Sequence, residues 1–157
     1  MKFSVNRESL VKPLQQVAGV VERRQTLPVL SNLLLQVNGS ELSMTGTDLE
    51  VELIGRLQVE NAEPGEITVP ARKLVDICRE IPDKAEIEFS LNENRLEIRS
   101  GRFRSTLSTL PAVDFPSADQ TSTEFTAELE PKALKRLLDK TAFAMAQQDV
   151  RYFLNGM

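Results

Sequence analysis

Histidine and tryptophan are absent from this 157-residue sequence, which also has a single tyrosine and a single cysteine. Histidine is the commonest general base and metal ligand, so its absence argues against an enzyme, although carboxylate or lysine chemistry stays open. Cys78 alone can form neither an internal disulfide nor a multi-cysteine zinc site. We therefore expect no catalytic residue, no metal site and no cofactor.

Long apolar runs are also missing. No stretch reaches the about 18 residues that a membrane-spanning helix needs, and Met1 leads into a polar, alternating segment rather than a secretory signal. These absences predict a cytoplasmic protein without a membrane partner.

The pattern of apolar residues is repeated along the chain. Residues 1–5 alternate as a strand, Asn6 can cap a helix over 7–20, and alternating segments follow at 33–37, 41–45 and 49–53. The same order returns as a strand at 67–69, a helix at 71–80 and strands at 87–91, 96–98 and 102–107. Pro70 suits the first turn of the second helix. The sequence thus predicts an α+β fold made of duplicated β-α-β-β-β units.

A shift of 54 positions aligns the strands of the two units. It places Leu33 on Ile87, Leu42 on Leu96 and Leu53 on Leu107. We assign residues 1–121 to one domain, with half-repeats at about 1–62 and 63–121.

A third copy of the pattern follows residues 110–116, whose two prolines indicate a linker. A shift of 124 places the first strand on 125–129 and the first helix on 131–145, and a second strand begins near the end of the chain. One strand, one helix and a strand start cannot close a core. Residues 122–157 are therefore expected to be the incomplete start of a second domain in a longer protein.

Charge is unevenly spread between the expected helices and the rest of the chain. The helical windows 7–20, 71–80 and 131–145 carry net charges of +1, +1 and +3, whereas the whole chain carries −4, so the remainder carries −9. Lys132, Arg136 and Lys140 share one helical face. Such helices are either solvated outer faces or an organised basic surface that binds phosphates without reading sequence.

Four motifs resemble a known family. They are TGTDLE at 45–50, VPARK at 69–73 with DICR at 76–79, STLPA at 108–112 with DFP at 114–116, and QDVRYFLNGM at 148–157. Together they closely resemble the bacterial sliding clamps, the β subunits of DNA polymerase III. Family members have three such domains, so the likeness covers the first domain and the start of the second.

The resemblance implies a DNA-clamp fold with helices packed on one face of antiparallel sheets. It also implies a function without catalysis. Two subunits join head to tail around double-stranded DNA, helices line the hole, and the ring tethers the polymerase for processive replication. Implied partners are the second subunit, and the clamp loader, DNA polymerases and repair proteins that bind through short peptide tails.

Five residues match family positions that contact DNA. They are Arg24, Arg72, Gln148, Tyr152 and Phe153. Aromatic side chains stack on bases in a sequence-tolerant way. Read without the resemblance, both arginines are ordinary surface residues and Phe153 is a core residue at a strand start.

Two further surfaces follow from the resemblance. Arg151, Leu154 and Gly156 match the near edge of the groove that accepts partner peptides. The dimer interface is expected at the alternating 102–107 edge strand. Its matching residues are Lys73, Ile77, Arg102, Arg104 and Leu107.

Two competing functions stay open. Asp48, Glu50 and Glu52 alternate in a predicted strand and so share one face, which is either a solvated surface or part of a magnesium site of a carboxylate-dependent enzyme. The other alternative is a protein-interaction module that uses the 102–107 edge or the 148–157 segment and never touches DNA. Cys78 is interpreted as a small core residue.

Overall fold

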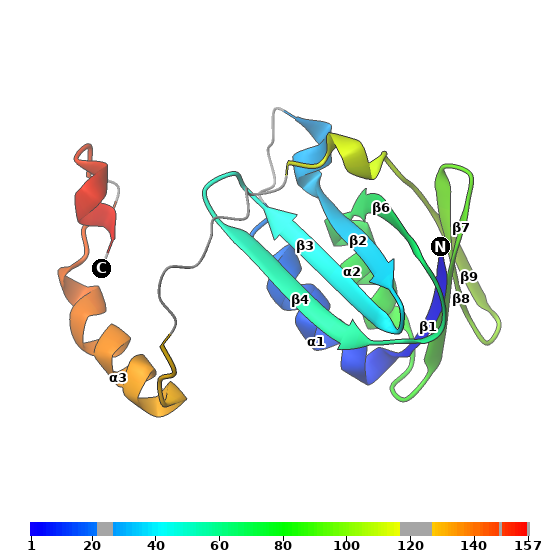
Figure 1. The fold of residues 1–157 in the computed structure, drawn as a ribbon, viewed down its shortest axis with the longest axis horizontal. Coiled ribbons are helices and arrows are strands. Elements are labelled where there is room, and N and C mark those ends of the chain that lie inside the picture. Colours follow the sequence, from blue (N-terminus) through cyan, green and yellow to red (C-terminus); the bar gives the residue numbers. More distant parts are fainter. Residues whose placement is uncertain (22–26, 117–126, 148, 157) are drawn as a thin grey trace. The chain divides into compact units, whose positions relative to one another are not determined.

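The computed structural model describes residues 1–21, 27–116, 127–147 and 149–156. It forms two compact units, Met1–Ala118 and Asp119–Met157 (Figure 1). The described part of the first unit begins with β1 (Lys2–Asn6), α1 (Arg7–Ala18), β2 (Asn32–Asn38), β3 (Glu41–Thr47), β4 (Glu52–Gln58) and β5 (Glu60–Glu63). It continues with β6 (Gly65–Pro70), α2 (Ala71–Glu80), β7 (Glu86–Asn92), β8 (Arg95–Ser100) and β9 (Phe103–Ser108).

The two repeats exchange their first strands. One sheet has the order β5-β1-β7-β8-β9 and the other β4-β3-β2-β6, with every described pairing antiparallel. Phe3 of β1 lies opposite Phe89 of β7, with the two rings stacked 4.6 Å apart. Val69 of β6 lies opposite Leu33 of β2. Each repeat therefore completes the sheet of the other, and the predicted α+β fold of duplicated units is confirmed.

The sheet register corrects one predicted equivalence. Leu42 pairs with Leu57, and its counterpart Leu96 pairs with Leu107. The residue of the first repeat that is equivalent to Leu107 is therefore Leu57 rather than Leu53. The hairpin between β3 and β4 is longer than the one between β8 and β9, which moves the register of the last strand.

Helices α1 and α2 pack against each other and against the sheets, which bury their apolar faces. Asn6 caps α1 as predicted, because its Oδ1 accepts the backbone N–H of Glu8 at 2.9 Å. Leu10 and Leu14 of α1 occupy the positions that Leu74 and Cys78 occupy in α2, and all four are buried. Burial raises the pKa of the Cys78 thiol to about 12, so this cysteine is neutral and serves the core as predicted.

The predicted strand at 49–53 is wrong, because the chain makes a turn before β4 begins at Glu52. Asp48 Oδ1 accepts the backbone N–H groups of Val51 at 2.7 Å and Glu50 at 2.9 Å, which also lowers the pKa of Asp48. Leu49 takes a φ of 79° in this turn. Asp48, Glu50 and Glu52 therefore do not share one strand face.

The proline-containing segment 110–116 packs on the domain instead of acting as a linker. Leu110 pairs with Thr68 at the edge of β6, with backbone hydrogen bonds of 3.1 and 3.2 Å. Ala112–Asp114 form a short 3-10 helix, η2, and Phe115 is buried in a second small cluster with Val29, Leu30 and Leu34. Residues 110–116 therefore form a strap across the domain, and its two prolines do not keep it away from the core.

The second unit contains α3 (Pro131–Thr141), a 3-10 turn, η3 (Ala142–Ala144), and another, η4 (Tyr152–Asn155). One prediction here is wrong, because residues 127–129 form no strand. Tyr152–Asn155 form a 3-10 turn, and the strand that is expected to begin at the end of the chain stays a prediction, since Met157 lies outside the described residues. A strand needs a hydrogen-bonded neighbour, and no strand is described in this unit. Residues 125 and 126 of the predicted strand lie outside the described residues.

Candidate nucleic-acid interface

The outer surface of α1 and α2 is polar and carries exposed cations. Lys12 of α1 and Arg72, Lys73 and Arg79 of α2 are exposed. A groove of about 310 Å³ separates the C-terminal end of α1 from α2. It is lined by Gln15, Ala18, Gly19, Arg72, Val75, Asp76 and Arg79. Two arginines against one carboxylate suit this groove to an anion such as a phosphate.

Arg7 joins the N-terminal end of α1 to the C-terminal end of α2. Its Nε donates to the carbonyl of Cys78 at 3.3 Å, its Nη2 donates to the carbonyl of Arg79 at 3.0 Å, and its Nη1 contacts Asp83. The first residue of α1 thus caps the last turn of α2, where a helix presents unsatisfied carbonyls and negative dipole charge. Ala71 occupies the equivalent position of α2, and its buried methyl group has no polar atom to make such contacts with α1.

Helix α3 has a basic face and buries none of its residues. Lys132, Arg136 and Lys140 recur every four residues and therefore lie along one side. Lys135 forms an ion pair with Asp139 within the same helix. Tyr152 is 84% exposed and Phe153 69% exposed, with their rings edge to face at 6.2 Å. The core interpretation of Phe153 is therefore wrong for the unit as described.

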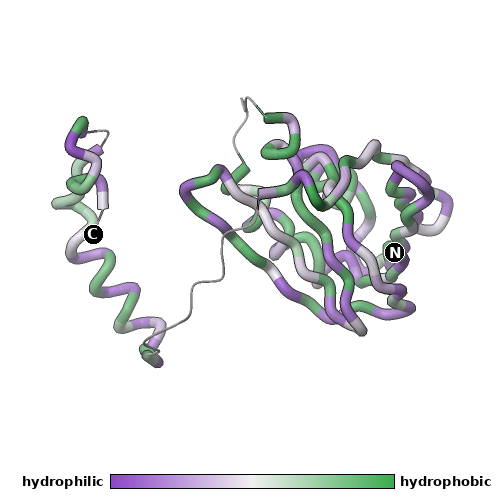
Figure 2. Tube along the Cα trace, turned by 45° about the horizontal axis from the view of Figure 1, so that its top comes forward, coloured by the Kyte–Doolittle hydropathy of each residue, from purple (hydrophilic) through white to green (hydrophobic). Residues whose placement is uncertain are grey.

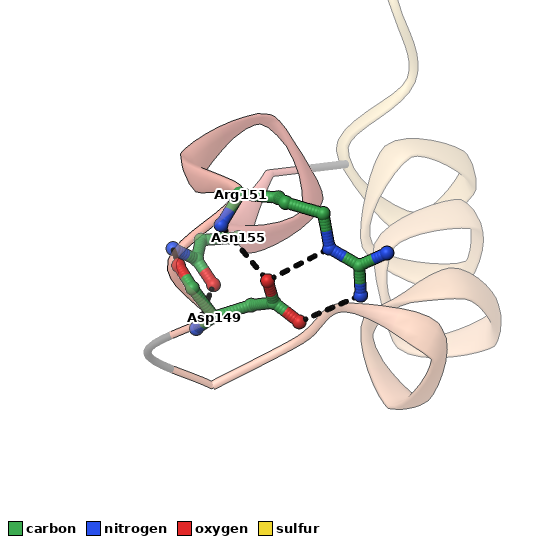
Figure 3. Close-up of polar contacts among 3 residues, drawn as sticks. All are labelled: Asp149, Arg151 and Asn155. Atoms are coloured by element: carbon green, nitrogen blue, oxygen red, sulfur yellow. Dashed lines mark hydrogen bonds and ion pairs between the residues drawn. The ribbon is translucent and has the colours of Figure 1, made fainter.

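Asp149 organises the turn that precedes these aromatic residues (Figure 3). It accepts two hydrogen bonds from the Arg151 guanidinium and one from the Arg151 backbone, at 2.8–3.0 Å. Asn155 closes the loop, because its Oδ1 accepts the Asp149 N–H and its Nδ2 donates to the Asp149 carbonyl. The Arg151 guanidinium lowers the pKa of Asp149 and in turn has its own pKa raised.

A second groove lies beside the edge strand β9. It has a volume of about 380 Å³, and its walls include Lys73 and Ile77 of α2 with Leu107 of β9. Arg104 is exposed on β9, and Arg102 is exposed in the turn just before it. The groove therefore combines the apolar Ile77 and Leu107 with charged and hydroxyl side chains, among them Lys73 and Asp76. It lies beside an edge of β9 with which no described strand pairs.

Comparison with known proteins identifies the family. Residues 1–119 match the family described as DNA polymerase III beta subunit, N-terminal domain. The chain belongs to this family. The beta sliding clamps of Pseudomonas putida and Escherichia coli K12 are 63% and 56% identical to it. Both alignments cover 100% of this chain but only 43% of the relative.

Solved structures of clamp-family proteins share the fold. A sliding clamp of Pseudomonas aeruginosa bound to griselimycin superposes with a TM-score of 0.95 at 60% identity, over 100% of this chain and 43% of that one. The DNA polymerase III β subunit of Caulobacter crescentus gives 0.93 at 42% identity, over 99% and 42%. The predicted clamp fold is thereby confirmed.

The structure brings the five predicted interface residues of the clamp family together. Lys73, Ile77, Arg102, Arg104 and Leu107 all lie at or beside β9. Of the predicted DNA contacts, Arg72 is exposed on α2 and the two aromatic residues are exposed on η4, whereas Arg24 and Gln148 lie outside the described residues. Arg151, Leu154 and Gly156 fall in one short segment, and Leu154 is half-buried.

Other residues of this site were missed by the sequence reasoning. Arg79 shares the groove with Arg72, since seven residues make about two helical turns. The hydrogen bonds between Asp149 and Asn155 close a loop, and the periodic spacing of apolar residues in the sequence does not predict such contacts. In the described part of the chain, no group of three or more His, Cys, Asp or Glu residues is placed to hold a metal ion. None of the described helices is long and apolar enough to cross a membrane.

Proposed function

We propose that this chain supplies the first domain, residues 1–121, and the start of the second, residues 122–157, of a sliding clamp. Such a protein acts in the bacterial cytoplasm without catalysis, by encircling duplex DNA and keeping the replicative polymerase close to its template. The observation that carries the proposal is the presence of exposed cations on the helices of each unit of a clamp-family chain: Arg72 and Arg79 on α2, and a basic face on α3.

The DNA contacts are proposed to be of two kinds. Arg24, Arg72 and the basic face of α3 contact phosphates, which gives binding without sequence preference. Gln148, Tyr152 and Phe153 form a separate contact, in which the exposed rings stack on bases.

The edge strand β9 is proposed as the subunit interface of the ring. An unpaired edge can add a strand from a partner, and the groove beside it offers Ile77 and Leu107 for apolar contact. Arg102 and Arg104 favour an acidic partner strand. Arg151, Leu154 and Gly156 form one edge of the groove for peptide tails of polymerases, clamp loader and repair proteins.

A salt titration of duplex binding tests the DNA proposal. Fluorescence anisotropy with a labelled duplex measures the dissociation constant of the chain between about 20 and 200 mM salt. Replacing Lys132, Arg136 and Lys140 together with glutamine removes three cations from one face of α3. Loss of three phosphate contacts lowers the slope of log K against log salt by about 2.7, at 0.9 for each contact.

A matched triple variant gives the control. Replacing Lys2, Arg95 and Arg99 with glutamine removes the same charge from strands, and the slope is expected to stay near that of the parent chain. Equal slopes in all three proteins would contradict a basic face that contacts DNA. Absence of duplex binding at the lowest salt, with peptide binding retained, would favour the protein-interaction module instead.

A further inference from the structure

The strap at residues 110–116 occupies in the second repeat the place that β5 occupies in the first. Glu60 of β5 pairs with Ser4 of β1, and Leu110 of the strap pairs with Thr68 of β6. Glu60 and Leu110 each follow, by three positions, the equivalent leucines of the two repeats. Ser4 and Thr68 each come three positions before the helix of their repeat. The strap is therefore the counterpart of an edge strand.

The strap is fastened to its sheet at a single residue, whereas β5 pairs with β1 at two positions. The Thr68 N–H donates to the Leu110 carbonyl at 3.1 Å, and the Leu110 N–H donates to the Thr68 carbonyl at 3.2 Å. Pro111 comes next and has no N–H to continue the pairing. The remaining hydrogen bonds of the strap in the described chain join strap residues to one another. A strand that pairs at one residue is held weakly.

A buried chain of hydrogen bonds strengthens this fastening. Asn32 Nδ2 donates to Thr68 Oγ1 at 2.9 Å, and Thr68 Oγ1 donates to the Leu110 carbonyl at 2.9 Å. Asn32 and Thr68 are both buried. Because the hydroxyl accepts from Asn32, its single hydrogen is left to donate toward the strap.

Apolar contact fastens the strap at a second point, apart from the main core. Hydrophobic and hydrophilic residues alternate along the strands of the first unit, and the hydrophobic ones fill that core from both sheets (Figure 2). Phe115 packs instead in a small separate cluster with Val29 and Leu30 of η1 (Pro28–Ser31) and Leu34 of β2 (Figure 1). Loss of this cluster therefore leaves the contacts of the main core in place.

We propose that the strap is a clasp that opens as one unit while the two sheets stay folded. Opening breaks the hydrogen bonds at Thr68 and separates the Phe115 cluster, but it removes no residue from the main core. It uncovers the edge of β6 and releases seven residues, which can extend over about 25 Å, where the chain leads into the second unit. Segments with few buried contacts open at a lower free energy than the core of the same protein. This device is separate from the proposed DNA binding.

Native-state hydrogen exchange of the 157-residue chain, followed by NMR at low urea concentrations, tests the proposal. The protection factors of the Thr68 and Leu110 amides are expected to be at least about 100-fold lower than those of the slowest amides of β3, which has a strand on each side. They are also expected to depend less on urea, since opening of the strap exposes less surface than unfolding does. Equal protection and equal urea dependence would overturn the proposal.

Ile87→Val separates opening of the strap from unfolding of the core. Ile87 is buried in the main core, and loss of one methylene group speeds exchange through unfolding by about three- to tenfold. The slowest amides of β3 are expected to follow this change, whereas those of Thr68 and Leu110 stay within about twofold of the parent. An equal increase at both places would mean that the strap opens only when the core unfolds, and the proposal would be wrong.

Variants at the two fastening points test the clasp itself. Phe115→Ala is expected to speed exchange of the Leu110 amide by at least about tenfold. Thr68→Val takes a donor from the Leu110 carbonyl and is expected to speed it by about fivefold, and Thr68→Ser, which keeps the hydroxyl, by less. Val113→Ala is the matched control, because Val113 belongs to the strap but is 88% exposed, and it leaves the rate within about twofold.

Circular dichroism of each variant shows whether the sheets remain folded. Exchange at Leu110 that neither Phe115→Ala nor Thr68→Val changes, in folded proteins, would overturn the proposal. None of these outcomes bears on duplex binding, which the salt titration measures separately.

Discussion

Replacing Gly46 with alanine is expected to destabilise the first unit through a clash with backbone. Gly46 is buried in β3, and a Cβ there would lie 2.8 Å from the carbonyl oxygen of Val17 and 2.9 Å from Leu33 Cδ2. The Val17 carbonyl accepts the N–H of Val20 at 3.4 Å, just beyond the end of α1. Relieving the clash therefore moves the helix end as well as a side chain.

The magnitude follows from two opposing effects. Overpacking of a core costs about 1–3 kcal/mol, and the lower entropy of the unfolded alanine chain offsets about 0.4–1 kcal/mol of this. A net loss of about 1.5 kcal/mol, with a urea m value of about 1.5 kcal/mol/M, lowers the unfolding midpoint by about 1 M. Circular dichroism during urea titration measures this midpoint.

Gly55→Ala on the neighbouring strand is the matched comparison. Its added Cβ would meet the Cγ2 methyl of Val17 at 3.0 Å and the end of Met44 at 3.5 Å, and both are side-chain atoms that can shift. We expect it to lose less stability than Gly46→Ala. An unchanged midpoint for Gly46→Ala, or a larger loss for Gly55→Ala, would refute the reasoning.

Two further predictions concern polar contacts. Arg7→Met leaves the carbonyls of Cys78 and Arg79 without their donor and is expected to lower the free energy of unfolding by about 1–3 kcal/mol; Arg72→Met, at an exposed position, changes it by less than about 0.5 kcal/mol in the same urea titration. In the folded chain the pKa of Asp149 lies below its ordinary value of 3.8. The ionised carboxylate therefore stabilises the 149–155 turn fully above pH 3.8, and this stabilisation is lost as the pH falls through the folded pKa. A carboxyl NMR titration is expected to give a midpoint below 3.8 that rises in Arg151→Gln, and an equal midpoint in both proteins would contradict the contact.

Apolar periodicity predicted the helices and most of the strands, because burial on one face imposes it. The cap at Asn6 and the core role of Cys78 followed from local chemistry in the same way. The turn at 48–51 was missed because Leu49, Val51 and Leu53 alternate as a strand does, while hydrogen bonds to Asp48 impose a different backbone. Local patterns carry little information about such side-chain contacts.

Contacts between distant segments account for the other gaps. The pairing of β1 with β7, the strap at Leu110 and the reach of Arg7 to α2 all join residues more than 40 positions apart. The pairing of β6 with β2 joins residues 28 to 38 positions apart. The interface residues around β9 were predicted by resemblance to the clamp family, and three of them, Lys73, Ile77 and Leu107, line one groove.

The exchange of first strands also sets an order of events during synthesis. Val5 finds its partner in Ile87, about 80 residues later in the chain. At about 5–20 residues per second, the ribosome needs roughly 4–16 s to make β7 after β1. Until then β1 has no β7 to pair with, and the sheet of the first repeat also waits for β6. The two repeats therefore cannot mature one after the other, and the nascent domain is expected to fold in a single late step governed by these long-range pairings.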